Sequence, residues 1–142
     1  MLPALLALAA VVPSASAHYQ VKSPAPRGFD EAIEDQAPCG GYNSVQSPRT
    51  PFGIIGSSVS LATYHPAAGG AYYISTSENP QSNDDFVLVN NTLNWSSVGN
   101  YQVDMPLTNL TTPLTPGQNA TLQVRYDGGD HILYQCIDIT LV

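Results

Sequence analysis

Three histidines are the residues of this chain whose types and spacing could do chemistry: His18, His65 and His131. If His18 becomes the first residue of a processed chain, its α-amine and imidazole can chelate one metal ion together, because their unperturbed pKa values of about 8 and 6.5 allow both to lose their protons. The imidazole of His65 would complete a set of three nitrogens. Such a set favours Cu(II), which also has the highest intrinsic affinity among the divalent first-row ions. The competing interpretation is that His18 and His65 are incidental, one left by processing and the other part of a loop before Pro66.

The first 17 residues predict the processing that exposes His18. They form an apolar run closed by Ala15-Ser16-Ala17, and these small residues are what a signal-peptide cleavage site requires. A membrane-spanning helix needs about 20 predominantly apolar residues, whereas this run is short and contains Pro3 and Pro13. We therefore expect a signal peptide over 1–17 and one secreted domain over 18–142.

The composition limits the class of protein and of partner. Hydrophobic residues make up 43% of the chain and charged residues 11%, with 11 Gly and 12 Pro, which suits short strands joined by many turns. The formal net charge is -7, and phosphate backbones are bound mainly through Lys and Arg. We expect a monomer that does not bind nucleic acid.

The sequence after His18 predicts an all-β fold. Segments of β-type composition with partial alternation recur between clusters of turn residues, at 19–23, 58–64, 71–76, 86–90, 101–107, 121–126 and 132–141. Residues 36–56 predict a long irregular loop, and residues 30–35 predict either one helical turn or a solvated loop. This pattern fits an antiparallel β-sandwich of the immunoglobulin or fibronectin kind with long loops.

Secretion predicts covalent modification of the two cysteines and of the four acceptor sequons. In an oxidising compartment Cys39 and Cys136 are expected to form one disulfide, which contributes on the order of 4 kcal/mol in the chain-entropy model. The sequons predict N-glycosylation and exposed positions, and they begin at Asn90, Asn94, Asn109 and Asn119.

The motifs around these residues resemble those of the fungal copper acquisition factor family. They stand in the right order over nearly the whole mature chain: His18-Tyr19, the run PAPRGFD at 24–30, PCGG at 38–41, YHP at 64–66 and LYQCIDI at 133–139. That family is similar in fold and copper brace to lytic polysaccharide monooxygenases. The sequence departs from the expected pattern in one respect, because a further cysteine pair is missing.

The resemblance implies a copper(II) site made of the N-terminal histidine, a second histidine and an acidic residue. Here these look like His18, His65 and Asp138, with Asp130 as the alternative acid. Asp138 shares a strand face with Cys136, so it is expected to be covered, and a covered carboxylate needs a metal or a paired cation. Arg49 or Lys22 would be such a cation. Asp130 stands in a glycine-containing segment that fits a hairpin turn, where Asp is common.

The resemblance also implies a function. It indicates copper binding at the cell surface, for copper acquisition or homeostasis, without enzymatic oxidation of a polysaccharide. A membrane copper transporter or cell-wall components are the expected partners. A lipid anchor of the glycosylphosphatidylinositol type beyond Val142 is a further expectation.

Two other functions stay open at this point. A copper-dependent polysaccharide monooxygenase would need the same three nitrogens, an open coordination position and a flat face of exposed aromatic residues, but Trp95 lies inside a sequon. A structural cell-wall module would need no metal at all. His131, Arg49 and the acids at 30–35 are interpreted as parts of the solvated surface, since charged residues are usually exposed.

Overall fold

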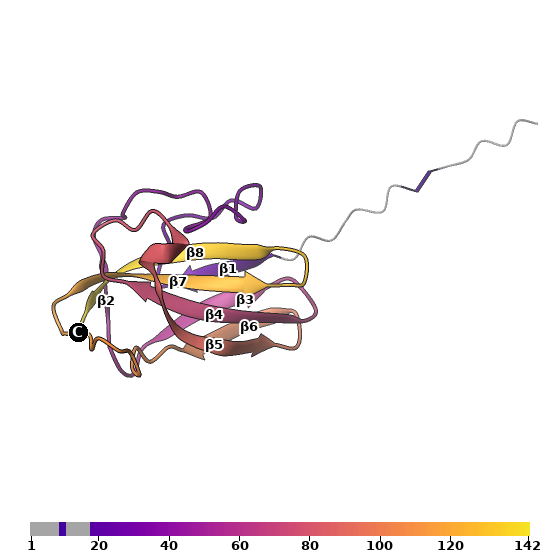
Figure 1. Ribbon diagram of the computed structural model, residues 1–142. Coiled ribbons are helices and arrows are strands. Elements are labelled where there is room, and N and C mark those ends of the chain that lie inside the picture. Colours follow the sequence, from indigo (N-terminus) through magenta and orange to yellow (C-terminus); the bar gives the residue numbers. More distant parts are fainter. Residues whose placement is uncertain (1–8, 11–17) are drawn as a thin grey trace, which may run out of the picture.

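The computed structural model describes residues 9–10 and 18–142, and it is a sandwich of two β-sheets (Figure 1). The three-stranded sheet has the order β1 (Tyr19–Ser23), β3 (Ser58–Thr63) and β6 (Gly99–Asp104). The five-stranded sheet has the order β2 (Thr50–Phe52), β8 (Ile132–Leu141), β7 (Asn119–Asp127), β4 (Ala68–Ser75) and β5 (Val87–Trp95). A short 3-10 helix, η1 (Asn83–Asp85), precedes β5. The predicted all-β sandwich is confirmed.

Alternating side chains explain why these segments form two facing sheets. In the first part of β3 the side chains of Val59 and Leu61 are buried, while those of Ser58 and Ser60 are partly exposed. Between the sheets the ring of Tyr19 stacks on that of Tyr126, with centroids 4.7 Å apart and planes 5° apart. Trp95 stacks on the same Tyr126 ring at 5.5 Å. Each such buried side chain stabilises the fold by about 1.5–3 kcal/mol relative to leaving it exposed.

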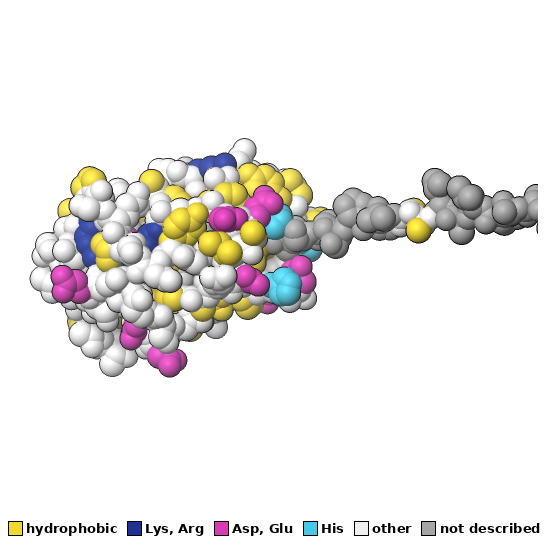
Figure 2. All heavy atoms as spheres, turned by 90° about the horizontal axis from the view of Figure 1, so that it is seen from above, with side chains coloured by type: hydrophobic (Ala, Val, Ile, Leu, Met, Phe, Trp, Pro, Cys, Tyr) yellow, Lys and Arg dark blue, Asp and Glu magenta, His cyan; other side chains and the backbone are white. Residues whose placement is uncertain are grey.

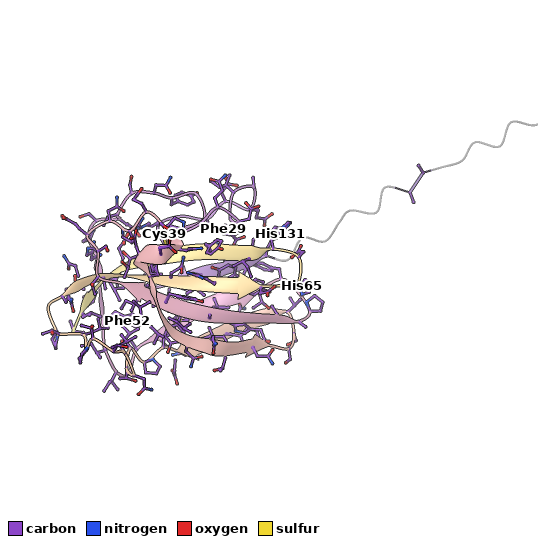
Figure 3. The ribbon with its side chains drawn as sticks, viewed as in Figure 1. Phe29, Cys39, Phe52, His65 and His131 are labelled. Atoms are coloured by element: carbon purple, nitrogen blue, oxygen red, sulfur yellow. A yellow bond between two sulfur atoms is a disulfide. The ribbon has the colours of Figure 1, made fainter. Side chains whose placement is uncertain are left out.

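The long loop between β1 and β2 covers the outer face of β8. A disulfide joins Cys39 in this loop to Cys136 in β8, which confirms the predicted pair (Figure 3). Next to it, Gly40 has φ +63°, and a Cβ there would lie 2.4 Å from the carbonyl oxygen of Tyr134. The loop can approach β8 this closely only because position 40 is glycine.

Part of the segment predicted as one irregular loop is a strand. Residues 50–52 form β2, which pairs in parallel with β8, so the sandwich is not purely antiparallel. Three residues are too few to show a period, and Pro51 opposed a strand assignment. Pro51 is tolerated because β2 is the edge of its sheet. Residues 31–35 form hydrogen-bonded turns, in which the Ile33 amide donates to Asp30.

The sequons lie where glycans could be attached. Asn94, Asn109 and Asn119 are exposed, and Asn90 is partly buried in the edge strand β5. Glycosylation itself stays a prediction.

The predicted signal peptide, residues 1–17, lies outside the described residues except for positions 9 and 10. Within the described part of the chain, no helix has the length and apolarity needed to cross a membrane.

Candidate metal centre

Strand pairing brings His18 next to the turn that holds His65. Tyr19, the first residue of β1, pairs with Thr63, the last residue of β3. One residue further out, the carbonyl oxygen of His18 accepts a hydrogen bond of 2.9 Å from the amide of Tyr64. His65 is the next residue, so two histidines far apart in the sequence lie at the same end of the sandwich.

The turn after β3 fixes the orientation of the His65 ring. Its Nδ1 makes a short hydrogen bond with the carbonyl oxygen of Ala67. A carbonyl can only accept, and the Ala67 amide lies farther from Nδ1, at 3.3 Å, so the shorter contact assigns the ring proton to Nδ1. This leaves the lone pair on Nε2, the arrangement usual for a metal-binding histidine whose second nitrogen is held by a backbone carbonyl.

The His18 ring lies between two glutamates of the β1–β2 loop. Its Nε2 is 3.5 Å from Oε2 of Glu31, and its Nδ1 is 3.7 Å from Oε2 of Glu34. The Glu31 side chain is 58% exposed, but that of Glu34 is only 1% exposed. Burial raises the pKa of Glu34 to about 8, opposed by a hydrogen bond from Gln135 and assisted by the charge of Glu31.

Glu34 is the residue at this site that the sequence interpretation missed. The acids at 30–35 were expected on a solvated surface, and for Glu34 this expectation is wrong. The sequence pattern does not reveal that Glu34 is buried, because a turn has no periodicity from which burial can be predicted. The carbonyl of Glu34 accepts from the Tyr134 amide at 2.9 Å, and this contact with β8 draws the side chain inward.

Asp138 lies on the covered outer face of β8, as predicted. Its buried negative charge is neutralised by an arginine side chain. Arg27 donates two hydrogen bonds to its carboxylate, from Nε at 2.9 Å and from Nη2 at 3.0 Å. The Gln46 amide donates at 2.8 Å and the Thr121 hydroxyl at 2.7 Å. The cation is therefore chiefly Arg27; Arg49, one of the two expected, is 3.8 Å away.

These contacts make Asp138 a structural carboxylate in the structure described here. Burial acts to raise its pKa, but the hydrogen bonds from Arg27, Gln46 and Thr121 together hold the pKa below its usual value. The sequence showed that Asp138 would be covered, but not which group would cover it. Its assignment as a metal ligand stays a prediction, and the geometry does not favour it.

The alternative acid, Asp130, lies at the same end of the sandwich as His18 and His65. Asp127 at the end of β7 pairs with Gly69 at the start of β4, and the β7–β8 turn with Asp130 follows directly. Figure 3 shows His65 and His131 at this end, and Figure 2 shows histidine and acidic side chains together there. His131 is exposed, as expected, and its amide donates to Oδ1 of Asp130 at 2.9 Å.

The side chains alone do not form a preassembled metal cage. Among residues 9–10 and 18–142, no three side chains of His, Cys, Asp or Glu come together as a metal-binding group. The predicted site takes two of its nitrogens from His18, and one of these is the α-amine that only cleavage before His18 would create. The orientation of His65 and the position of His18 fit such a site.

Comparisons with known proteins place the chain in a family. The model of the copper acquisition factor BIM1-like domain matches residues 16–142. The chain is 36% identical over 152 residues to copper acquisition factor BIM1 of Cryptococcus neoformans var. grubii, covering 99% of this chain and 67% of that protein. It is 33% identical to lytic polysaccharide monooxygenase-like protein X325 of Yarrowia lipolytica, covering 94% of this chain and 52% of that protein. The chain thus spans between about half and two thirds of these relatives.

Solved structures share the fold at low sequence identity. The catalytic domain of the lytic polysaccharide monooxygenase Lmo2467 from Listeria monocytogenes has a TM-score of 0.60 at 14% identity, over 88% of this chain and 99% of that one. A CBM33 protein from Bacillus amyloliquefaciens in complex with Cu(I) has a TM-score of 0.51 at 18% identity, over 72% of this chain and 62% of that one. From the family model and the sequence relatives together, we conclude that the chain belongs to the BIM1-like copper acquisition factors.

Proposed function

We propose that the mature chain begins at His18 and binds one Cu(II) ion through a histidine brace: the α-amine and imidazole of His18 and the imidazole of His65. Membership of the copper acquisition family supports copper as the metal. The observation that carries the proposal is the 2.9 Å hydrogen bond from the Tyr64 amide to the His18 carbonyl, because it holds both histidines at one end of the fold.

The proposed role is to capture copper, or hand it on, outside the cell. The predicted signal peptide, the sequons and the Cys39–Cys136 disulfide fit secretion, since disulfides persist in oxidising compartments. A membrane transporter or cell-wall components would be the partners, and a membrane anchor would follow Val142.

Binding rather than oxidation is proposed because of the charge around His18. The carboxylate of Glu31 faces Nε2 of its ring at 3.5 Å, whereas Glu34, 3.7 Å from Nδ1, is mainly neutral near pH 7 because burial raises its pKa to about 8. Negative charge beside the metal stabilises Cu(II) relative to Cu(I), and a carboxylate that coordinates it occupies space that oxygen activation needs. The monooxygenase alternative predicts oxidised oligosaccharides when copper, a reductant and a panel of polysaccharides are supplied; their detection would reverse this choice.

The brace is tested by comparing the protein that begins at His18 with a form that carries one additional residue before it. The extension turns the α-amine of His18 into a peptide nitrogen and moves the free amine one residue away from the imidazole. We expect tight Cu(II) binding and nitrogen hyperfine structure in the EPR spectrum of the first form only. If both forms bind equally weakly, the structural-module function replaces the copper function.

A further inference from the structure

The outer face of the five-stranded sheet carries a hollow of about 390 Å³. Its centre is made by side-by-side residues of three strands: Gly69 and Ala71 of β4, Asp127 and Arg125 of β7, and Ile132 and Tyr134 of β8. Directly paired residues share one face of a sheet, here the face of β8 that also carries Cys136. A Cβ on Gly69 would meet only the carbonyl oxygen of Leu93, at 3.7 Å. The small residues of β4 therefore leave open space between bulkier neighbours.

The guanidinium group of Arg125 is held at this hollow with most of its donors unused. Its Cζ lies 3.6 Å from the centroid of the Tyr73 ring, and its Nε donates to Oε1 of Gln123 at 2.7 Å. Gln123 is fully buried and itself donates to the Pro38 carbonyl at 2.8 Å. In the part of the chain that the structure describes, Nη1 and Nη2 of Arg125 have no hydrogen bond and no ion pair. A cation whose orientation is fixed by two contacts thus keeps four N–H donors for a ligand.

Arg125 differs from the other two arginines in having no acidic partner. Arg27 and Arg49 both face the buried carboxylate of Asp138, at 2.9 and 3.8 Å. Two parallel N–H groups of a planar guanidinium match the two oxygens of a carboxylate and form short, strong hydrogen bonds with it. The unused donors of Arg125 therefore fit a carboxylate that comes from outside the chain.

The rest of the hollow selects among carboxylates. Asp127 and Asn91 also line it. Asp127 follows Arg125 on the same face of β7, roughly 6.5–7 Å along the strand. Its Oδ1 accepts from the Gly129 amide at 2.8 Å, which leaves Oδ2 for a ligand. The negative charge of Asp127 and the net charge of -7 oppose an anion with several charges, whereas hydroxyl groups can donate to Asp127 and can both donate to and accept from Asn91.

We propose that this hollow binds a small carboxylic acid that carries hydroxyl groups, as sugar acids do. Arg125 holds the carboxylate, Asn91 and Asp127 bind the hydroxyl groups, and Tyr134 supplies an apolar wall. The volume of about 390 Å³ lies within the range of about 300–1,000 Å³ that is usual for small-molecule sites. The site uses neither His18 nor His65, so the inference is independent of the proposed copper function.

The test is an NMR titration of the ¹⁵N-labelled mature protein with sodium D-glucuronate. No copper is added, so that the acid cannot act by chelating the metal. We expect the amides of 69–71, 125–127 and 132–134 to shift, with a dissociation constant of about 1 mM, which is the value that the usual free energy per ligand atom gives for a molecule of this size. D-glucose lacks the carboxylate and acetate lacks the hydroxyl groups, and both should bind at least about tenfold more weakly.

Variants assign the binding to Arg125 and to the hollow. Arg125→Gln should lower the affinity for D-glucuronate at least about tenfold, since a hydrogen bond to a charged group accounts for about 10–100-fold. Lys22→Gln is the matched control, because it removes the same charge from an exposed position in the other sheet, and it should bind like the wild type. Ala71→Leu fills the hollow and leaves Arg125 in place. The same loss in Ala71→Leu keeps the test decisive if Arg125→Gln does not fold.

Three results would overturn the proposal. Acetate that binds as tightly as D-glucuronate would reduce the site to one for simple anions. D-glucose that binds equally well, or an unchanged affinity in Arg125→Gln, would show that no carboxylate is held there. The third is the absence of any shift at the named amides. None of these results bears on Cu(II) binding, which the form extended before His18 tests separately.

Discussion

The carbonyl oxygen of His18 accepts a hydrogen bond from the amide of Tyr64, 2.9 Å away, immediately before the pairing of β1 with β3 begins. This bond makes the position of the first residue of the predicted mature chain depend on the turn that carries His65. A chain end is otherwise poorly ordered unless it is tied down, and here a strand of the sandwich does so. The two histidines are thus placed by the same pair of strands.

Replacing His65 tests whether its imidazole is a ligand of the copper ion. His65→Ala in the mature protein should weaken Cu(II) binding by about 100-fold or more, because a direct ligand contributes at least as much as the groups that orient it. His131→Ala is the matched control, since His131 is exposed at the same end, and its affinity should stay near the wild-type value. Competition titration with a Cu(II) chelator measures both. A loss of affinity in His131→Ala with His65→Ala unchanged would mean that His131, not His65, is the second imidazole ligand.

Replacing Asp138 should affect stability rather than copper. Asp138→Asn leaves Arg27 buried without its carboxylate, and breaking a buried pair in this way lowers the free energy of unfolding by about 3–5 kcal/mol. The exposed Asp104 offers a control with the same substitution. Urea unfolding gives the stability, and copper titration of the folded protein gives the stoichiometry. A folded Asp138→Asn protein that has lost tight copper binding would restore Asp138 as the metal ligand.

The same ion pair predicts how stability depends on acid. The pKa of Asp138 is lowered in the folded protein, so the unfolded chain binds its proton more readily than the folded one. Its contribution is therefore complete above the unfolded pKa of about 3.9 and is lost as the pH falls through the lower folded value. The unfolding free energies of wild type and Asp138→Asn should converge below about pH 4. Parallel curves from pH 7 to 2 would contradict this.

The disulfide should stabilise the protein mainly by restricting the unfolded chain. Cys39 and Cys136 are 97 residues apart, and closing a loop of that length contributes roughly 4–5 kcal/mol in the chain-entropy model. Replacing both cysteines by alanine should remove this contribution and lower the melting temperature accordingly. Reductant should lower the melting temperature of the wild type toward that of the variant and leave the variant unchanged. An identical melting temperature for wild type and variant would contradict the prediction.

The strands could be predicted where their residues alternate or are strongly β-forming. The strands β1 and β8 have the predicted bounds, 19–23 and 132–141, because turn residues flank them clearly. The sequence interpretation ended the strand at 86–90 too early, whereas β5 continues to Trp95 through a run of asparagines. Asparagine has low β-propensity, and only pairing with β4 keeps this segment extended.

The sequence by itself determined which residues could do chemistry: a histidine after a cleavage motif, a second histidine at the end of a strand, two cysteines and a covered aspartate. Only the tertiary structure decided which acid belongs to which partner. Asp138 faces Arg27, while Glu34, from a turn without periodicity, is drawn inward by Gln135 and Tyr134 to face His18. The physical reason is that local pattern encodes which face of a strand is buried, but the partner of a buried charge comes from a segment far away in the chain.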